Sequence, residues 1–162
     1  MEPQSTQAAT TLSSRPSQVP AFVRMTNGLV SRLGRLGVPL GPNTLLTVRG
    51  RKSGVPRTTP VAIVKVAGRR WIQSPFGEVQ WTRNLRAAGE ATLTTGRRVE
   101  EVSAVSLSRD EAAAFYRDIL RPYLSRSPFT RVVGRALGLS ALVADPEGAA
   151  ATHAVFELRH RA

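Results

Sequence analysis

The segment from Leu45 to Leu85 constrains the fold of this chain most strongly, because apolar runs and turns alternate within it at short intervals. It opens with LLTVRGRKSGVPRTTP, in which a turn rich in glycine and cationic residues separates two apolar runs, and it ends with IQSPFGEVQWTRNL. Short runs rich in β-branched residues and bounded by glycine and proline are typical of antiparallel hairpins. The segment therefore predicts a small barrel or rolled antiparallel sheet rather than a parallel one.

The rest of the chain adds further strands and places helices between them. We expect strands at residues 45–48, 58–66, 70–73, 91–95, 99–105 and 154–158, with a turn at Ala67-Gly68. We expect helices at residues 78–88 (ended by Gly89), from the Ser108/Glu111 capping box to about Leu120 before Pro122, and at 129–137. Hairpins with inserted helices predict the α+β class.

The N-terminal part divides into a tail and a helix. Residues 1–18 are rich in Ser, Thr, Gln and Pro and are expected to be disordered, which leaves residues 19–162 as a single domain. Residues 22–36 carry apolar side chains at helical spacing, so this helix either packs over the barrel end or attaches to a membrane surface. The N-terminus does not resemble a signal peptide, so we expect a cytoplasmic protein, with peripheral attachment at the inner membrane face left open.

Composition excludes several classes of active site. The chain has no cysteine and only two histidines, His153 and His160, so neither a metal centre nor a catalytic triad is expected. The formal charge of +12 arises between residues 21 and 98, where the only acids are Glu78 and Glu90. Such a field attracts anions to this section of the chain.

The turn after Val48 is the candidate anion site. Its cations are Arg49, Arg51, Lys52 and Arg57, interleaved with Gly50, Gly54 and several hydroxyl side chains. Guanidinium, ammonium and backbone N–H groups that converge on one volume suit a ligand with several negative charges. The alternative is a hairpin tip whose charges are simply solvated.

Together, GRKSGxPRxxP, an apolar strand and WxxNL resemble the deazaflavin-dependent nitroreductase family. These actinobacterial oxidoreductases use the reduced form of coenzyme F-420, an 8-hydroxy-5-deazaflavin. The resemblance covers roughly residues 22–120. It implies an α+β split β-barrel, a flavin-reductase or FMN-binding-like roll with flanking helices. It also implies coenzyme F-420 as the cofactor, with FMN as the alternative.

The resemblance further implies the residues of the site. Those that bind the coenzyme would be Arg51, Lys52, Ser53, Arg57, Thr58, Thr59, Pro60, Val61, Ala62, Ser74, Pro75, Phe76, Gln80, Trp81, Thr82 and Asn84. Tyr123 and Ser74 would supply or relay the proton that follows hydride transfer. A tryptophan such as Trp81 is more often a core anchor than a residue that stacks on a ring, although one side chain can do both, and Asn84 is also typical of a residue that caps a helix or bridges loops.

The implied activity is hydride transfer to a small electron-poor acceptor: a quinone, a nitro compound or a conjugated enone. The tyrosine-rich segment of the nitro-reducing members is replaced here by LRPYLSRSPFTRVVGRAL, so a quinone fits as well as a nitro compound. Two alternatives remain, a non-catalytic module that binds a flavin-like anion and a basic nucleic-acid-binding protein. The second is disfavoured because aromatic residues are few (6%) and no nucleic-acid-binding motif is present, so we expect no nucleic-acid partner. The sequence leaves monomer and homodimer open.

Overall fold

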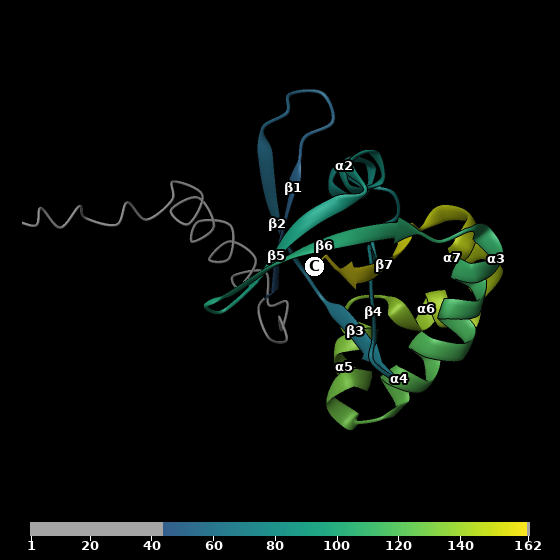
Figure 1. Ribbon diagram of the computed structural model, residues 1–162. Helices are drawn as coiled ribbons and strands as arrows, with labels where there is room; N and C mark the ends of the chain where they lie inside the picture. Colours follow the sequence, from purple (N-terminus) through teal and green to yellow (C-terminus); the bar gives the residue numbers. More distant parts are fainter. Residues whose placement is uncertain (1–43, 162) are drawn as a thin grey trace, which may run out of the picture.

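The computed structural model describes residues 44–161, which form one antiparallel sheet and a group of helices (Figure 1). The strands lie in the order β2-β1-β5-β6-β7-β4-β3. Their bounds are β1 Thr44–Arg49, β2 Pro56–Val61, β3 Ile63–Val66, β4 Arg69–Gln73, β5 Glu90–Thr95, β6 Arg98–Ser106 and β7 Val155–His160. The predicted tail at residues 1–18 and the predicted helix at residues 22–36 lie outside the described residues.

The sheet curls because its two edge strands follow each other directly along the chain. β2 and β3 lie at opposite ends of the strand order, yet only Ala62 separates them in sequence. One residue spans at most about 3.6 Å, so the two edges must come close together. The prediction of one strand over residues 58–66 was wrong for this reason: β2 pairs with β1, whereas β3 pairs with β4. The curled sheet confirms the predicted α+β split barrel.

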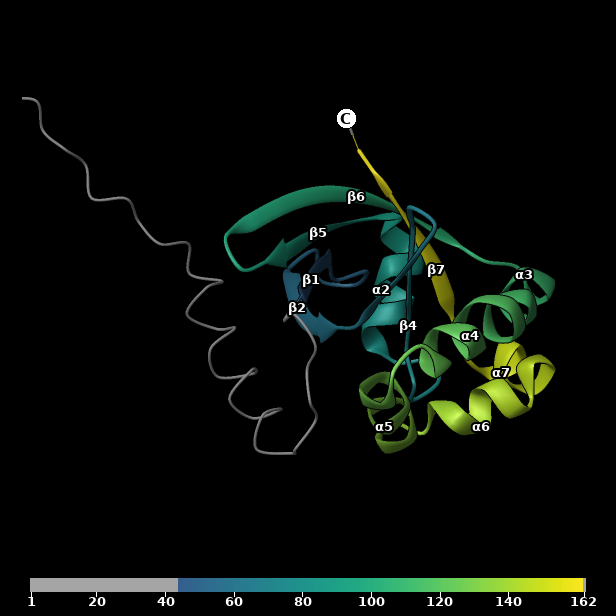
Figure 2. The same ribbon diagram turned by 90° about the horizontal axis from the view of Figure 1, so that it is seen from below.

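Two apolar clusters fill the two faces of the sheet. The first includes Leu46, Leu93 and Phe156 from the strands and Leu85 from helix α2 (Gln80–Ala88). The second lies under the later helices and includes Val64, Trp71, Phe115, Tyr116, Leu120 and Val155. Phe156 and Leu158 of β7 lie in the first cluster and Val155 in the second, and Glu157 is also buried, so this strand is buried on both faces. Figure 2 shows the later helices gathered on one side of the sheet.

The later helices form a continuous run between β6 and β7. They are α3 Arg109–Ala114, the π-helical segment η1 Phe115–Leu120, α4 Arg121–Ser125, α5 Pro128–Ala136, α6 Leu139–Ala144 and α7 Pro146–Thr152. The capping box of Ser108 and Glu111 is confirmed, as is the helix predicted at residues 129–137. No helix within residues 44–161 is long and apolar enough to cross a membrane.

The predicted end of the first of these helices at Leu120 was wrong. The chain stays helical through Pro122 because the preceding turn is wide, and the N–H of Arg121 donates to the carbonyl of Tyr116. Pro122 stands in the first turn of α4, where a proline is tolerated because the N–H groups of a first turn have no partner within their own helix. Helix α2 begins at Gln80 rather than Glu78, because Val79 is extended, and it ends at Gly89 as predicted.

Candidate functional site

The cationic turn closes the β1–β2 hairpin through its own backbone. The N–H of Gly50 donates to the carbonyl of Val55 (2.9 Å), and the N–H of Gly54 donates to that of Gly50 (2.8 Å). A Cβ at Gly50 would lie 2.9 Å from Ser53 Oγ and 3.1 Å from the Val55 oxygen, and Gly54 has φ +69°. Both glycines are therefore required by the turn, which fixes where its cationic side chains begin.

Arg51 joins this turn to the start of helix α2. Its Nη1 donates to Gln80 Oε1 (2.9 Å) and to Asn84 Oδ1 (3.0 Å), and its backbone N–H donates to the same Asn84 oxygen (3.3 Å). Asn84 is buried, with 7% of its surface exposed. The two halves of the sequence pattern, 33 residues apart, thus meet in one place (Figure 1).

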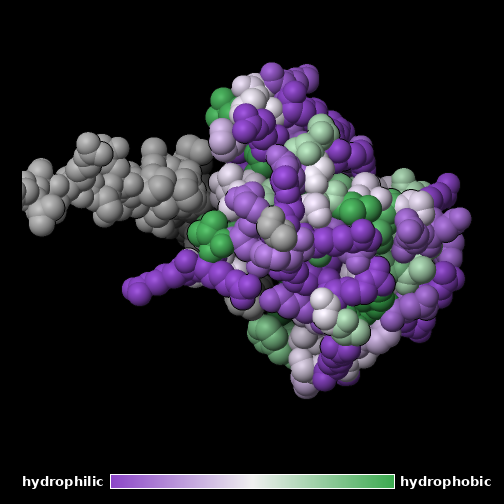
Figure 3. Space-filling model, in the orientation of Figure 1, coloured by the Kyte–Doolittle hydropathy of each residue, from purple (hydrophilic) through white to green (hydrophobic). Residues whose placement is uncertain are grey.

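Within the described chain no ion pair neutralises the charges of the turn, although Arg51 is near enough to Glu78 to help lower the pKa of its carboxyl, after Arg86 and Arg83. Among residues 44–161, no ion pair involves Arg49, Arg51, Lys52 or Arg57. Many other arginines pair with carboxylates, namely Arg69, Arg70, Arg83, Arg86, Arg98, Arg117, Arg159 and Arg161. Hydrophilic residues occupy much of this end of the molecule in Figure 3. The turn therefore offers unpaired cations to an anion from outside the chain.

The first residues of α2 combine polar contacts with packing. Trp81 is half-buried against the first cluster, with its ring centroid 6.3 Å from that of Phe156. Thr82 is fully buried, and its hydroxyl donates to the carbonyl of Val79 (2.7 Å). These two residues hold the helix against the sheet, whereas Gln80 is exposed beside Arg51.

The loop between β4 and α2 contributes the residues predicted before the helix. Ser74 is buried, and its Oγ accepts a hydrogen bond from the N–H of Phe76 (3.3 Å). Pro75 is half-buried, and Phe76 is 74% exposed. The loop therefore holds Ser74 inside the fold and leaves one large aromatic ring open to solvent close to the start of α2.

Strand β2 carries the remaining predicted residues along one edge of the sheet. Arg57 is exposed, and Thr58, Thr59, Pro60 and Val61 are half-buried. Thr58 lies opposite Thr47, and their hydroxyl oxygens are 2.9 Å apart. Ala62 stands at the break between the two edge strands. The side chains of β2 therefore extend the surface of the cationic turn along the edge strand of the sheet.

Tyr123 lies apart from the groups above. It packs, half-buried, against the second cluster, and the Arg126 guanidinium stands 5.8 Å from its ring centroid. Both Figure 1 and Figure 2 place α4 and the β1–β2 hairpin in different parts of the molecule. The described chain thus brings the turn, the loop and α2 together, but does not bring Tyr123 to them.

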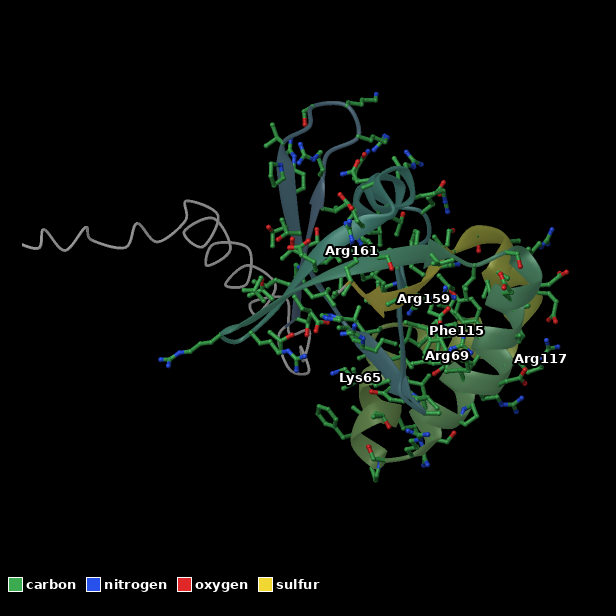
Figure 4. All side chains as sticks on the ribbon, viewed as in Figure 1. Lys65, Arg69, Phe115, Arg117, Arg159 and Arg161 are labelled. Atoms are coloured by element: carbon green, nitrogen blue, oxygen red, sulfur yellow. The ribbon has the colours of Figure 1, made fainter. Side chains whose placement is uncertain are left out.

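The sequence reasoning missed a charge cluster on β7. The buried Glu157 accepts from Arg69 Nε (2.7 Å) and Arg159 Nη2 (2.9 Å), and these bonds hold the pKa of its carboxyl below the ordinary 4.5. The Arg69 guanidinium also stands 4.9 Å from the Trp71 ring centroid. Figure 4 shows Arg69, Arg159 and Phe115 near one another between the sheet and the helices. The sequence signal for this charge cluster was Glu157, an isolated glutamate within an apolar strand.

Burial also sets the state of one tyrosine. Tyr116 is fully buried, and its hydroxyl has no hydrogen-bond partner among residues 44–161. Burial raises the pKa of this phenol, because the phenolate would lose its hydration. Tyr116 therefore stays neutral in the folded protein.

Comparison with known proteins gives a family and supports the fold. A reductase described as dependent on F-420-H2 is 19% identical over 73% of this chain and 94% of its own, with a TM-score of 0.44. A Bacteroides thetaiotaomicron protein assigned to 5-nitroimidazole antibiotic resistance is 10% identical over 82% of this chain and 80% of its own, with a TM-score of 0.51, and it shares the fold. A search of the curated proteins finds no match. The model of the F-420H(2)-dependent quinone reductases matches residues 18–142, well over half of the sequence. The chain therefore belongs to the F-420H(2)-dependent quinone reductase family, whose reduced deazaflavin cofactor and reductase activity it shares.

Proposed function

We propose that this enzyme holds the reduced deazaflavin coenzyme at the cationic turn and the start of α2, and that a quinone is its acceptor. The observation that carries this proposal is the group of four unpaired cations on the turn, held against Asn84 by Arg51. When bound, the coenzyme supplies a hydride, and the protein provides binding and alignment. Nitro compounds and conjugated enones are further candidate acceptors.

The donor set fits an anionic coenzyme with a phosphodiester and a glutamate tail. Lys52 and Arg57 are exposed, so their N–H groups would bind phosphate or carboxylate oxygens without first leaving a carboxylate partner. A neutral ligand would provide no counter-charge for these cations. The charge of the turn therefore supports the tail and phosphate side of the coenzyme as its occupant.

Arg51 is oriented before any ligand arrives. A guanidinium has five N–H donors, and here the bonds to Gln80 and Asn84 use only Nη1. The edge formed by Nε and Nη2 remains for a bidentate contact with phosphate. Because Gln80 and Asn84 fix the side chain, less conformational entropy is lost when the anion binds.

The ring of the coenzyme would lie beyond the charged part of the site. Phe76 and Pro75 offer an apolar wall next to the start of α2, where Trp81 also lies. Ser74 is buried and holds the loop, so we assign it a positioning role. Tyr123 remains a candidate proton donor by resemblance alone.

A fluorescence titration of the full chain with coenzyme F-420, run beside FMN, tests the binding site. Lys52→Ala should weaken coenzyme affinity about tenfold through the loss of one charge-assisted contact. Arg97→Ala is the matched control, because Arg97 is an exposed cation at another hairpin turn that also lacks an ion pair among residues 44–161. Equal losses in both variants, or tighter binding of FMN, would contradict the proposed site.

Steady-state oxidation of the reduced coenzyme by a water-soluble quinone tests the reaction. Turnover is expected, and binding without turnover would leave a non-catalytic module instead. Displacement of the coenzyme by a DNA oligonucleotide at physiological salt would favour the nucleic-acid alternative.

A further inference from the structure

Helix α5 exposes apolar and cationic side chains together. Its inner side packs on the preceding helix: a Cβ at Gly134 would lie 2.8 Å from Leu124 Cδ2. Its exposed residues, here called the α5 outer surface, are Pro128, Phe129, Arg131, Val132, Arg135 and Ala136. In Figures 1 and 2 this helix lies at the edge of the molecule, where a large partner can reach it.

The α5 outer surface is divided lengthwise. Phe129, Val132 and Ala136 are spaced i, i+3 and i+7, so they share one side, and Arg131 and Arg135 form the adjoining side. Phe129 is 62% exposed and Val132 is 67% exposed, among the largest exposures of any apolar residue described. The described fold does not use these side chains to build its core.

The charge around this surface has one sign. Between Ile119 and Ala144 the sequence has four arginines and no acid. The arginines are Arg121, Arg126, Arg131 and Arg135, and none of them forms an ion pair within residues 44–161. The surface therefore repels other cations and is complementary to a dense layer of anions.

We propose that the α5 outer surface docks the protein on an anionic lipid membrane. An interfacial helix inserts aromatic and aliphatic side chains below the headgroups while adjoining arginines bind the phosphates, which is the division seen on α5. A second copy fits less well, because a two-fold contact through this surface would bring arginines of both copies to one interface, and residues 119–144 contain no acid to pair with them. This proposal does not depend on the coenzyme site.

Co-sedimentation of the full chain with vesicles tests the docking. Vesicles of phosphatidylglycerol and phosphatidylcholine should bind the protein, and vesicles of phosphatidylcholine alone should bind it much less. Arg131→Gln with Arg135→Gln should weaken binding about 30-fold, since each arginine near an anionic surface contributes about fivefold. Phe129→Ser should weaken it about tenfold, because one large apolar side chain no longer inserts.

Control substitutions outside α5 test whether the loss of vesicle binding is specific to the α5 outer surface. Arg97→Gln with Arg109→Gln removes the same charge from other exposed positions, and Val99→Ser removes an exposed apolar side chain from β6. These controls should bind vesicles as the unaltered chain does, and circular dichroism and coenzyme affinity should be unchanged in all variants. The proposal is overturned if anionic vesicles do not bind, if controls and α5 variants lose binding equally, or if the α5 variants change only the oligomeric state.

Discussion

Asn84 is the residue through which the link between the cationic turn and helix α2 can be tested most directly. Its Oδ1 accepts the backbone N–H of Arg51 (3.3 Å) and the guanidinium Nη1 (3.0 Å), and the residue is buried. Asn84→Ala removes this acceptor and leaves both donors of Arg51 without it. We expect the variant to fold less stably and to bind the coenzyme more weakly.

The size of the effect follows from the two bonds. A neutral hydrogen bond contributes about 1 kcal/mol and one from a charged donor about 1.5–3 kcal/mol. Arg51 is exposed, so water recovers part of this loss, and alanine gains about 0.5 kcal/mol in helix propensity. The net expectation is a loss of about 2 kcal/mol in the free energy of unfolding, or a fall in Tm of roughly 4–8 °C for a chain of this size.

Asn84→Asp separates the structural role from the electrostatic one. Aspartate keeps an acceptor for Arg51, so stability should stay close to that of the unaltered protein. It also places a negative charge beside the turn, which should lower affinity for an anionic coenzyme about tenfold at low salt and less at high salt. Gln80→Ala removes one exposed bond and should cost at most about 1 kcal/mol.

Urea unfolding followed by circular dichroism gives the free energies, and fluorescence titration gives the affinities. The reasoning fails if Asn84→Ala unfolds and binds like the unaltered chain, since Arg51 would then need no anchor. It also fails if Asn84→Asp binds coenzyme normally at low salt, because charge would then not govern the site.

Three other predictions concern the second cluster and the candidate proton donor. Tyr123→Phe should slow turnover while coenzyme affinity persists if the resemblance assigns its role correctly; unchanged steady-state rates would remove Tyr123 from the mechanism. Tyr116→Phe should stabilise the protein by about 1 kcal/mol, because it deletes a buried hydroxyl that has no partner in the described chain, and a lower Tm would reveal a partner. Arg69 and Arg159 lower the pKa of Glu157, so its stabilising contribution is complete above the unfolded value of 4.5 and is lost as pH falls through the lower folded pKa. Glu157→Gln should therefore flatten the acid side of the stability profile measured by denaturant unfolding, and a profile of unaltered slope would count against this ion cluster.

The strands could be predicted because their signals are local. Turns at Gly54 and Gly68 need positive φ, and the strands that lead into or out of them contain β-branched residues such as Val48, Thr58 and Val66. The break at Ala62 could not be predicted, because β-forming residues continue on both sides of it. Only the curl of the sheet separates them, and curl is a property of seven strands together.

Among the helices, too, features with a local sequence signal could be predicted and the others could not. Ser108 and Glu111 predicted a helix start because a capping box is complete within four residues. Helices α6 and α7 were not predicted, because six and seven residues are too few to establish a helical period and α7 contains no large apolar residue. The continuation through Pro122 depends on a wide turn, which no single residue of the sequence specifies.

The charge of the site could be predicted from the sequence, but the orientation of its side chains could not. The unpaired charge of the turn follows from residues 44–57, where four cations stand without an acid. The role of Arg51 could not be predicted from the sequence, because Arg51 and Lys52 are both simply cations of the turn at that level. In the fold, Asn84 and Gln80 hold Arg51 by one nitrogen and leave its other edge open, whereas Lys52 stays exposed and unpaired within the described chain. The two cations therefore differ in kind: Arg51 is preorganised for one bidentate anion, and Lys52 adds a mobile charge that any neighbouring anion can use. Replacing Arg51 by lysine should consequently cost more affinity than replacing Lys52 by arginine, although both exchanges preserve the charge.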